Sequence, residues 1–319
     1  MIHKIKISYR FDNLSILSNF VLKMVHYDQF KTNQLYRPIV GENMKSNFSH
    51  MKKIFVLLVV LVLASDCTTV PITGRSQMTG LISSDEVIAM STQAYKQVVD
   101  SVKLSNNAEQ VAMVKRVGNR IQKAVEQYMN NNGYTGLLDG FNWEFNVIDN
   151  DSTVNAWAMP GGKVAFYTGI LPICKDDLGV AVVMGHEVAH AVAKHGQERM
   201  NQNYAKQVGF SLGAVALGQD PSMGSRLVFQ AIGMGTEVGL LKFSRTHESE
   251  ADELGLTFMA IAGYDPNEAP KFWERMSEGS GGQAPPEFLS THPSHETRIA
   301  RLTAALPKAL EFYEKSQLK

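Results

Sequence analysis

Residues 176–196 read DDLGVAVVMGHEVAHAVAKHG, and the interpretation of the whole chain starts from this stretch. It contains no proline and ends at a glycine, which is typical of a helix and the residue that follows it. Apolar residues occupy nearly every position on both sides of the central His-Glu-Val-Ala-His at 186–190. A helix that is apolar nearly all round is buried, so we expect a buried helix over 176–195.

Two histidines of this helix, His186 and His190, are one turn apart and share a face. Both need partners, because an unpaired buried polar group costs roughly 2 kcal/mol or more. One zinc ion would satisfy both imidazoles, and catalytic zinc sites use three protein ligands and a water molecule. Glu187 stands about 100° around the helix from His186, beside the metal, which suits a general base for the bound water. The alternative is a pair of hydrogen-bonded core histidines.

The third ligand has to come from elsewhere in the chain. The metzincin pattern is excluded, because Ala193 and Gly196 occupy the positions of its glycine and its third histidine. His195 is half a turn away from His186 and faces away from the metal if the helix continues. That favours a structural or surface role for His195.

The segment SRTHESEADELG at 244–255 carries the best candidates for the third ligand. Glu248 and Asp252 are one helical turn apart and share a face. Glu248 would bind the metal, while Asp252 would accept the N–H of a ligating histidine and hold its tautomer. Glu250 is the rival ligand, and a solvated acidic helix start is the alternative for the whole segment.

Three motifs together resemble one gluzincin family, that of HtpX, the CAAX prenyl proteases and the mitochondrial Oma-type proteases. They are HExxH at 186–190, SRxxExEAD at 244–252 and THP at 291–293. The resemblance is strongest to the periplasmic lipoprotein branch and runs from about Cys67 to the C-terminus. It implies an α+β, zincin-like fold that is mostly helical, with a small mixed sheet carrying a substrate-binding edge strand.

The resemblance also implies roles for particular residues. It gives one zinc ion per chain, with Glu248 as its third ligand and Asp252 as the acid behind a ligating histidine. His292 of the THP motif would be a fourth ligand or an oxyanion-binding group, and its alternative is a histidine on the surface. Asn155 and Ala156 match the edge-strand signature, where an extended peptide adds as a further strand.

Local patterns predict the remaining elements of the fold. Helical periodicity is expected over 83–104, after the capping residues Ser83 to Glu86, and over 107–128. Alternation predicts a strand over 143–148, and a hairpin is expected over 154–167 around Pro-Gly-Gly. Cys174 is expected to be a small core residue.

The N-terminal part of the chain has the features of a targeting signal. A basic head at 51–53 precedes eleven apolar residues at 54–64, which are too few to span a bilayer. We interpret 51–66 as a signal peptide, 1–50 as a mis-assigned extension before the true initiator, and 67–319 as the zinc metallopeptidase domain.

Cys67 follows the apolar run and resembles the lipidated cysteine of bacterial lipoproteins, although Asp66 replaces the usual small residue. The alternative is simple cleavage that leaves Cys67 a free thiol. The apolar stretch at 207–241 contains polar interruptions, so we do not expect it to span a membrane.

Composition narrows the class of function. Basic and acidic residues each number 31, so no global positive field suggests nucleic acid, and two cysteines do not make a disulfide scaffold. The sequence predicts a zinc endopeptidase of the bacterial cell envelope, with Glu187 as general base. It would be lipid-anchored, periplasm-facing and on the outer membrane, and would cleave unfolded or extended polypeptides. The alternative is an envelope assembly factor or chaperone with little proteolysis.

Overall fold

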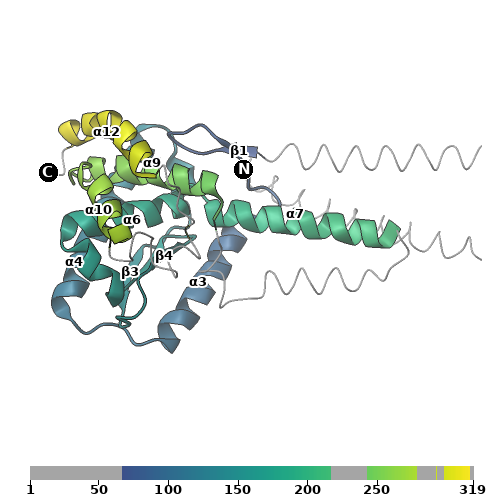
Figure 1. The fold of residues 1–319 in the computed structure, drawn as a ribbon. Coiled ribbons are helices and arrows are strands. Elements are labelled where there is room, and N and C mark those ends of the chain that lie inside the picture. The colour runs from purple at the N-terminus through teal and green to yellow at the C-terminus, as the bar shows by residue number, and fades with distance from the viewer. Residues whose placement is uncertain (1–66, 217–242, 279–291, 293–297, 317–319) are drawn as a thin grey trace, which may run out of the picture. The chain divides into compact units, whose positions relative to one another are not determined.

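A computed structural model describes residues 67–216, 243–278, 292 and 298–316 (Figure 1). The side chains of α7 beyond residue 205 are not included in this description. The expected extension 1–50 and signal peptide 51–66 lie outside the described residues, and so does most of the stretch 207–241. Among the described helices, none combines the length and the apolar character that a membrane span requires.

Helices make up most of the described chain. They are α3 (Ser84–Ser101), α4 (Ala108–Asn131), α5 (Leu171–Cys174), α6 (Asp177–Val192), α7 (His195–Ala216), α9 (Arg245–Ile261), α10 (Glu268–Glu278) and α12 (Arg298–Lys315), with 3-10 turns at Thr135–Leu138 and Thr168–Ile170. The strands are β1 (Cys67–Thr69), β2 (Ser76–Met78), β3 (Glu144–Ile148), β4 (Ala156–Met159) and β5 (Lys163–Tyr167). This confirms the predicted α+β class.

Two small sheets accompany the helices. β1 and β2 pair antiparallel and form the N-terminal hairpin, residues 67–78. The other sheet has the order β3-β5-β4, in which β3 runs parallel and β4 antiparallel to β5. The sheet is therefore mixed, as expected, and β4 is an edge strand that packs against α6.

The predicted helices at 83–104 and 107–128 are confirmed as α3 and α4. Ser83 and Glu86 form a capping box at the start of α3, in which each side chain bonds the backbone N–H of the other residue. Asn107 caps α4 by accepting two backbone N–H groups. Cys174 is fully buried in the core, as predicted.

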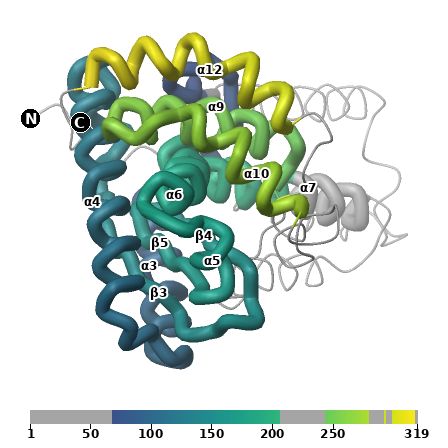
Figure 2. Tube along the Cα trace, turned by 60° about the vertical axis from the view of Figure 1, so that its left-hand side comes forward, coloured from purple at the N-terminus to yellow at the C-terminus, as the bar shows by residue number. Residues whose placement is uncertain are grey.

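Helix α6 lies at the centre of the domain (Figure 2). The Asp176 side chain caps it by accepting the N–H groups of Leu178 and Gly179. Every residue from Gly179 to Val192 is buried, because α4, α9 and β4 all pack around the helix. Helix α12 covers α9 on its other side (Figure 2).

Helices α6 and α9 approach each other through two glycines. A Cβ atom on Gly255 would lie 2.7 Å from the backbone nitrogen of His186. A Cβ atom on Gly185 would lie 2.7 Å from the carbonyl oxygen of Gly255. Only glycine permits such an approach, and it brings the first turns of α9 against the histidines of α6.

The expected end of the central helix was wrong by one turn. α6 ends at Val192, Lys194 has a φ of 55°, and His195 begins the new helix α7. Because Lys194 is left-handed, the chain changes direction after α6. His195 therefore does not lie on a continuation of α6, where it would face away from His186 and His190.

Candidate metal centre

Four buried side chains converge between α6 and α9. His186 and His190 come from α6, Glu248 comes from α9, and His292 comes from the segment before α12. One ligand atom from each residue lies within 4.8 Å of all the others. We call these four residues the ligand cluster.

Five contacts within the ligand cluster have the spacing of ligand atoms around one metal ion. His186 Nε2 lies 3.2 Å from His190 Nε2, 3.5 Å from Glu248 Oε2 and 3.3 Å from His292 Nδ1. Glu248 Oε1 lies 3.4 Å from His190 Nε2 and 3.2 Å from His292 Nδ1. Ligand atoms held roughly 2.0–2.1 Å from a tetrahedral zinc ion are separated from one another by about 3.3 Å. The residues of the ligand cluster therefore fit a zinc ion.

Arg298 holds the carboxylate of the cluster in place. Its Nη2 donates to Glu248 Oε2 at 2.8 Å and its Nε donates to Asp252 Oδ2 at 2.7 Å. The guanidinium carbon lies 3.9 Å from the ring centroid of Trp273. Burial alone would raise the pKa of Glu248, but His292, His186 and His190 together hold it well below its usual range.

Asp252 lies behind His186, where the sequence analysis expected it. Its Oδ1 is 3.0 Å from His186 Nδ1, which leaves the other ring nitrogen directed into the ligand cluster. Burial lowers the pKa of His186, but Asp252 and Glu248 outweigh burial and raise that pKa to about 9. Metal binding at this imidazole therefore displaces a proton.

Glu187 faces the cluster from α6 without being one of its four members. The residue is buried, and its Oε1 lies 3.5 Å from His292 Nε2. Among the described residues, this oxygen has no hydrogen-bond partner. Burial raises the pKa of Glu187, although the backbone N–H of Ala158 on β4 acts in the opposite direction. A buried carboxylate of raised pKa suits a proton acceptor.

His195 is fully buried, which excludes the surface role and agrees with the structural role that the sequence left open beside it. Its Nδ1 lies 2.9 Å from His190 Nδ1, and its Nε2 lies 2.9 Å from Glu250 Oε2. Burial lowers the pKa of His195 to about 4, so its imidazole is neutral at pH 7. Glu250, the rival ligand, contacts His195 and lies outside the four-residue cluster.

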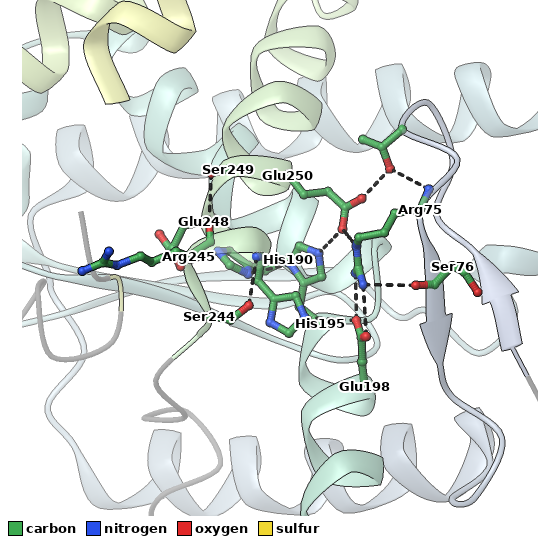
Figure 3. Close-up of polar contacts among 12 residues, drawn as sticks. Arg75, Ser76, His190, His195, Glu198, Ser244, Arg245, Glu248, Ser249 and Glu250 are labelled. Atoms are coloured by element: carbon green, nitrogen blue, oxygen red, sulfur yellow. Dashed lines mark hydrogen bonds and ion pairs between the residues drawn. The ribbon is translucent and has the colours of Figure 1, made fainter. Parts of the chain in front are cut away.

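The carboxylate of Glu250 belongs to a second group of polar side chains, in which Arg75 is partly exposed and the other members are buried (Figure 3). We call this group the hairpin network, because Arg75 of the N-terminal hairpin joins its members. The members are Arg75, His195, Glu198, His247 and Glu250. Sequence reasoning missed Arg75, Glu198 and His247, and it also missed Arg298. No local periodicity marks these residues, since their partners lie far away in the chain.

The predicted substrate-contact residues begin strand β4. Asn155 and Ala156 are both buried, and the Asn155 side chain accepts the N–H of Ala156 at 2.9 Å. The Asn155 carbonyl accepts the N–H of Tyr167 at 3.1 Å. Backbone groups alternate in direction along a strand, so Ala156 and Ala158 direct theirs away from β5.

The fold and the ligand cluster define a zincin-like metallopeptidase. The pattern of peptidase family M48 matches residues 115–306, and the chain belongs to this family. It is a zinc metalloendopeptidase, a hydrolase of peptide bonds. This confirms the family resemblance of the motifs.

Three curated relatives illustrate the similarity. The chain is 35% identical over 256 residues to the mitochondrial metalloendopeptidase OMA1 of Saccharomyces cerevisiae, covering 77% of this chain and 71% of the relative. It is 28% identical over 288 residues to the mitochondrial metalloendopeptidase OMA1 of Homo sapiens, covering 87% and 54%. It is 29% identical over 163 residues to the beta-barrel assembly-enhancing protease of Escherichia coli K12, covering 50% and 33%.

The expected location on a bacterial outer membrane is contradicted by these matches. The relatives aligned over most of the chain are mitochondrial proteins by name. The periplasmic lipoprotein branch is likewise not shown, and the lipidation of Cys67 stays a prediction. A basic head and a short apolar run indicate targeting, but the membrane is chosen by the machinery that reads the signal.

Proposed function

We propose that the chain binds one zinc ion through His186, His190 and Glu248 and cleaves extended polypeptides with Glu187 as general base. The observation that carries this proposal is the ligand cluster, in which one ligand atom from each of the four residues lies within 4.8 Å of the others and the shortest contacts are 3.2–3.5 Å. The buried carboxylate of Glu187 beside that cluster adds the group that accepts the proton.

Bound zinc would supply a Lewis acid that polarises the peptide carbonyl and lowers the pKa of a water molecule. Glu187 takes the proton of the attacking water and passes it to the leaving amine. Its raised pKa favours both transfers, since a stronger base accepts the proton and the resulting acid still donates it near neutral pH. Asp252 holds His186 so that Nε2 points at the metal.

The edge strand β4 supports the choice of an extended substrate. Ala156 and Ala158 direct backbone groups away from β5, and the N–H of Ala158 lies against Glu187. A peptide that adds along this edge would run past the general base. Main-chain pairing reads little side-chain sequence, which suits unfolded or extended polypeptides as substrates.

His292 occupies the position that a water molecule or a substrate carbonyl would need. Its Nδ1 lies 3.3 Å from His186 Nε2 and 3.2 Å from Glu248 Oε1. We infer that His292 would be the fourth protein ligand of a bound zinc ion and would restrain cleavage in that position. This makes the fourth-ligand role the favoured one over oxyanion binding.

Glu187→Gln tests the proposal directly. Glutamine cannot accept a proton, so we expect casein cleavage to fall by about 100-fold or more. The variant should keep its zinc, because Glu187 is not a member of the ligand cluster. Glu311→Gln, on the exposed surface of α12, is the matched control and should cleave casein normally.

Casein cleavage by Glu187→Gln at the rate of the unaltered protein would place the base elsewhere. A wild-type protein that binds unfolded casein without cleaving it would favour the alternative function, an assembly factor or chaperone that retains the metal.

A further inference from the structure

The N-terminal hairpin reaches the zinc-binding helix through a chain of buried contacts. Figure 3 shows Arg75 between Glu250 and Glu198. The ring of His195 contacts Glu250 through Nε2 and His190 through Nδ1. Arg75 Nε donates to Glu250 Oε2 at 2.8 Å, and its two terminal nitrogens donate to the Glu198 oxygens at 3.0 and 2.8 Å. One arginine thus bridges carboxylates from α7 and α9.

The Nε2 of His190 faces the ligand cluster, so an imidazole that binds the metal through Nε2 carries its proton on Nδ1. Glu250 is a carboxylate held by Arg75, so it accepts the Nε2–H of His195. With its Nε2–H directed at Glu250, His195 turns Nδ1 toward Nδ1 of His190. It therefore accepts the Nδ1–H of His190 at 2.9 Å. The Nε2 of His190 then keeps the lone pair that faces the ligand cluster.

His195 is held in this orientation from a second side. Its ring stacks on His247 with centroids 4.5 Å apart and planes inclined by 19°. The Nε2 of His247 lies 3.0 Å from Glu198 Oε2, the carboxylate that Arg75 also contacts. Arg75 therefore holds both the acceptor of His195 and, through Glu198, the ring that His195 stacks against.

The hairpin loop itself is shaped for these contacts. Thr73 donates its hydroxyl to Glu250 Oε1, next to the oxygen that Arg75 contacts. The preceding Ile72 has a φ of 70°, a left-handed conformation that a β-branched residue rarely adopts. Such a conformation persists where its surroundings determine it, and here the surroundings are the contacts of Thr73 and Arg75.

The proposed zinc ligands His186 and His190 are each supported by a carboxylate that an arginine holds. Behind His186 stands Asp252, which is held by Arg298. Behind His190 stands the same carboxylate–arginine pair, Glu250 and Arg75, with His195 inserted between. In each case an arginine holds a carboxylate in place. Asp252 faces the ring of His186 directly, and Glu250 reaches that of His190 through the ring of His195.

We propose that Arg75 of the N-terminal hairpin is a positioning residue of the metal centre, which acts through Glu250 and His195 on the zinc ligand His190. The proposal rests on the zinc site described under the proposed function. The N-terminal hairpin, which follows the predicted signal peptide, would then help to hold a metal ligand in position.

Zinc affinity of the full chain, measured by competition with a chelator, tests the proposal. Arg75→Ala should weaken zinc binding by about 10-fold or more, because groups behind a metal ligand are worth 10–100-fold in affinity. Arg75→Lys should recover only part of the loss, since one ammonium cannot bridge two carboxylates as the guanidinium does. The visible spectrum of the Co²⁺-substituted protein should shift, and kcat should fall more than KM rises.

Arg116→Ala is the matched control. Arg116 also holds a carboxylate at two points, because its Nε and Nη2 contact Asp177 at 2.8 and 2.5 Å. That carboxylate stands in the first turn of α6, away from the ligand cluster. Arg116→Ala should leave zinc affinity and the Co²⁺ spectrum unchanged.

A milder variant keeps the test decisive if Arg75→Ala does not fold. Thr73→Val removes only the hydroxyl that donates to Glu250, and should weaken zinc binding by a few-fold. Combining it with His195→Ala should add little to the loss caused by His195→Ala alone, because both changes interrupt one chain of contacts.

The outcomes separate the two proposals. If the unaltered protein binds no zinc, the proposed function fails. If it binds zinc, while Arg75→Ala and Thr73→Val lower only the melting temperature and leave zinc affinity and the Co²⁺ spectrum unchanged, the hairpin is a structural clip and this inference is overturned.

Discussion

Two clusters of histidines and carboxylates meet at the ring of His190, and they satisfy their buried polar groups in different ways. The ligand cluster faces Nε2 of His190, and the hairpin network faces Nδ1. The hairpin network contains a cation of its own, since Arg75 pairs with Glu198 and Glu250. The ligand cluster instead brings Nε2 of His186 within 3.2 Å of His190 Nε2 and 3.3 Å of His292 Nδ1.

The difference shows how identical residue types can make a structural network or a metal site. In the hairpin network every contact joins a donor to an acceptor, as in the sequence from Arg75 through Glu250 and His195 to His190. In the ligand cluster the Nε2 atoms of His186 and His190 are 3.2 Å apart, while their other nitrogens face acceptors. Ring nitrogens at this distance can share a proton or a metal ion, and with Glu248 and His292 beside them the four groups fit a metal ion.

Among the changes that test this comparison, removal of the metal ligands should have the largest effect on zinc binding. His186→Ala combined with His190→Ala should reduce bound zinc from about one ion per chain to none, as elemental analysis would show. His247→Ala removes a buried histidine of the hairpin network and should leave one zinc ion bound at saturating metal. Undiminished zinc in the double variant would refute the ligand assignment.

A substitution at the glycine contact between α6 and α9 should have the next largest effect, on both stability and zinc binding. Gly255→Ala places a methyl group 2.7 Å from the His186 backbone nitrogen, so the two helices have to separate. We expect a loss of about 1–3 kcal/mol in unfolding free energy and weaker zinc binding, because Glu248 moves with α9.

Gly136→Ala is the control for this change, since a Cβ atom there lies 3.7 Å from its nearest neighbour. Chemical denaturation and zinc competition would measure both variants. Zinc affinity unchanged in Gly255→Ala would mean that Glu248 is positioned independently of the helix crossing.

His292→Ala sharpens the comparison, because it removes one lone pair from the ligand cluster only. If His292 caps the zinc ion, basal proteolysis should rise by a few-fold while zinc is retained by the other three ligands. Initial rates with a quenched fluorescent peptide would show this. A lower rate with zinc retained would instead assign His292 to stabilisation of the transition state.

The smallest effect is a pH dependence that arises in the hairpin network. Burial raises the pKa of Glu198, but His247 and Arg75 outweigh it and lower that pKa from 4.5 to about 2. Glu198 therefore stabilises the fold fully above pH 4.5, and this contribution is lost as the pH falls toward 2.

Urea unfolding of the metal-free protein at several pH values would reveal this effect. The stability difference between the unaltered protein and Glu198→Gln should shrink as the pH falls from 4.5 toward 2. A difference that stays constant over that range would show that Glu198 titrates alike in the folded and unfolded chains.

The sequence alone determined those features that depend on neighbours along the chain. The burial of α6, the shared face of His186 and His190 and the pairing of Glu248 with Asp252 all follow from helical periodicity. The capped start of α3 and the hairpin of β4 and β5 are local for the same reason.

Only the tertiary structure decided what stands behind the metal ligands. The continued helix would have turned His195 away from the metal, but a single left-handed residue, Lys194, makes it the partner of His190. Arg75 and Glu198 are 123 residues apart, and Arg298 and Glu248 are 50 apart. No period of a helix or strand links residues at such separations, so only the packing of α6, α7, α9 and the N-terminal hairpin could bring them together.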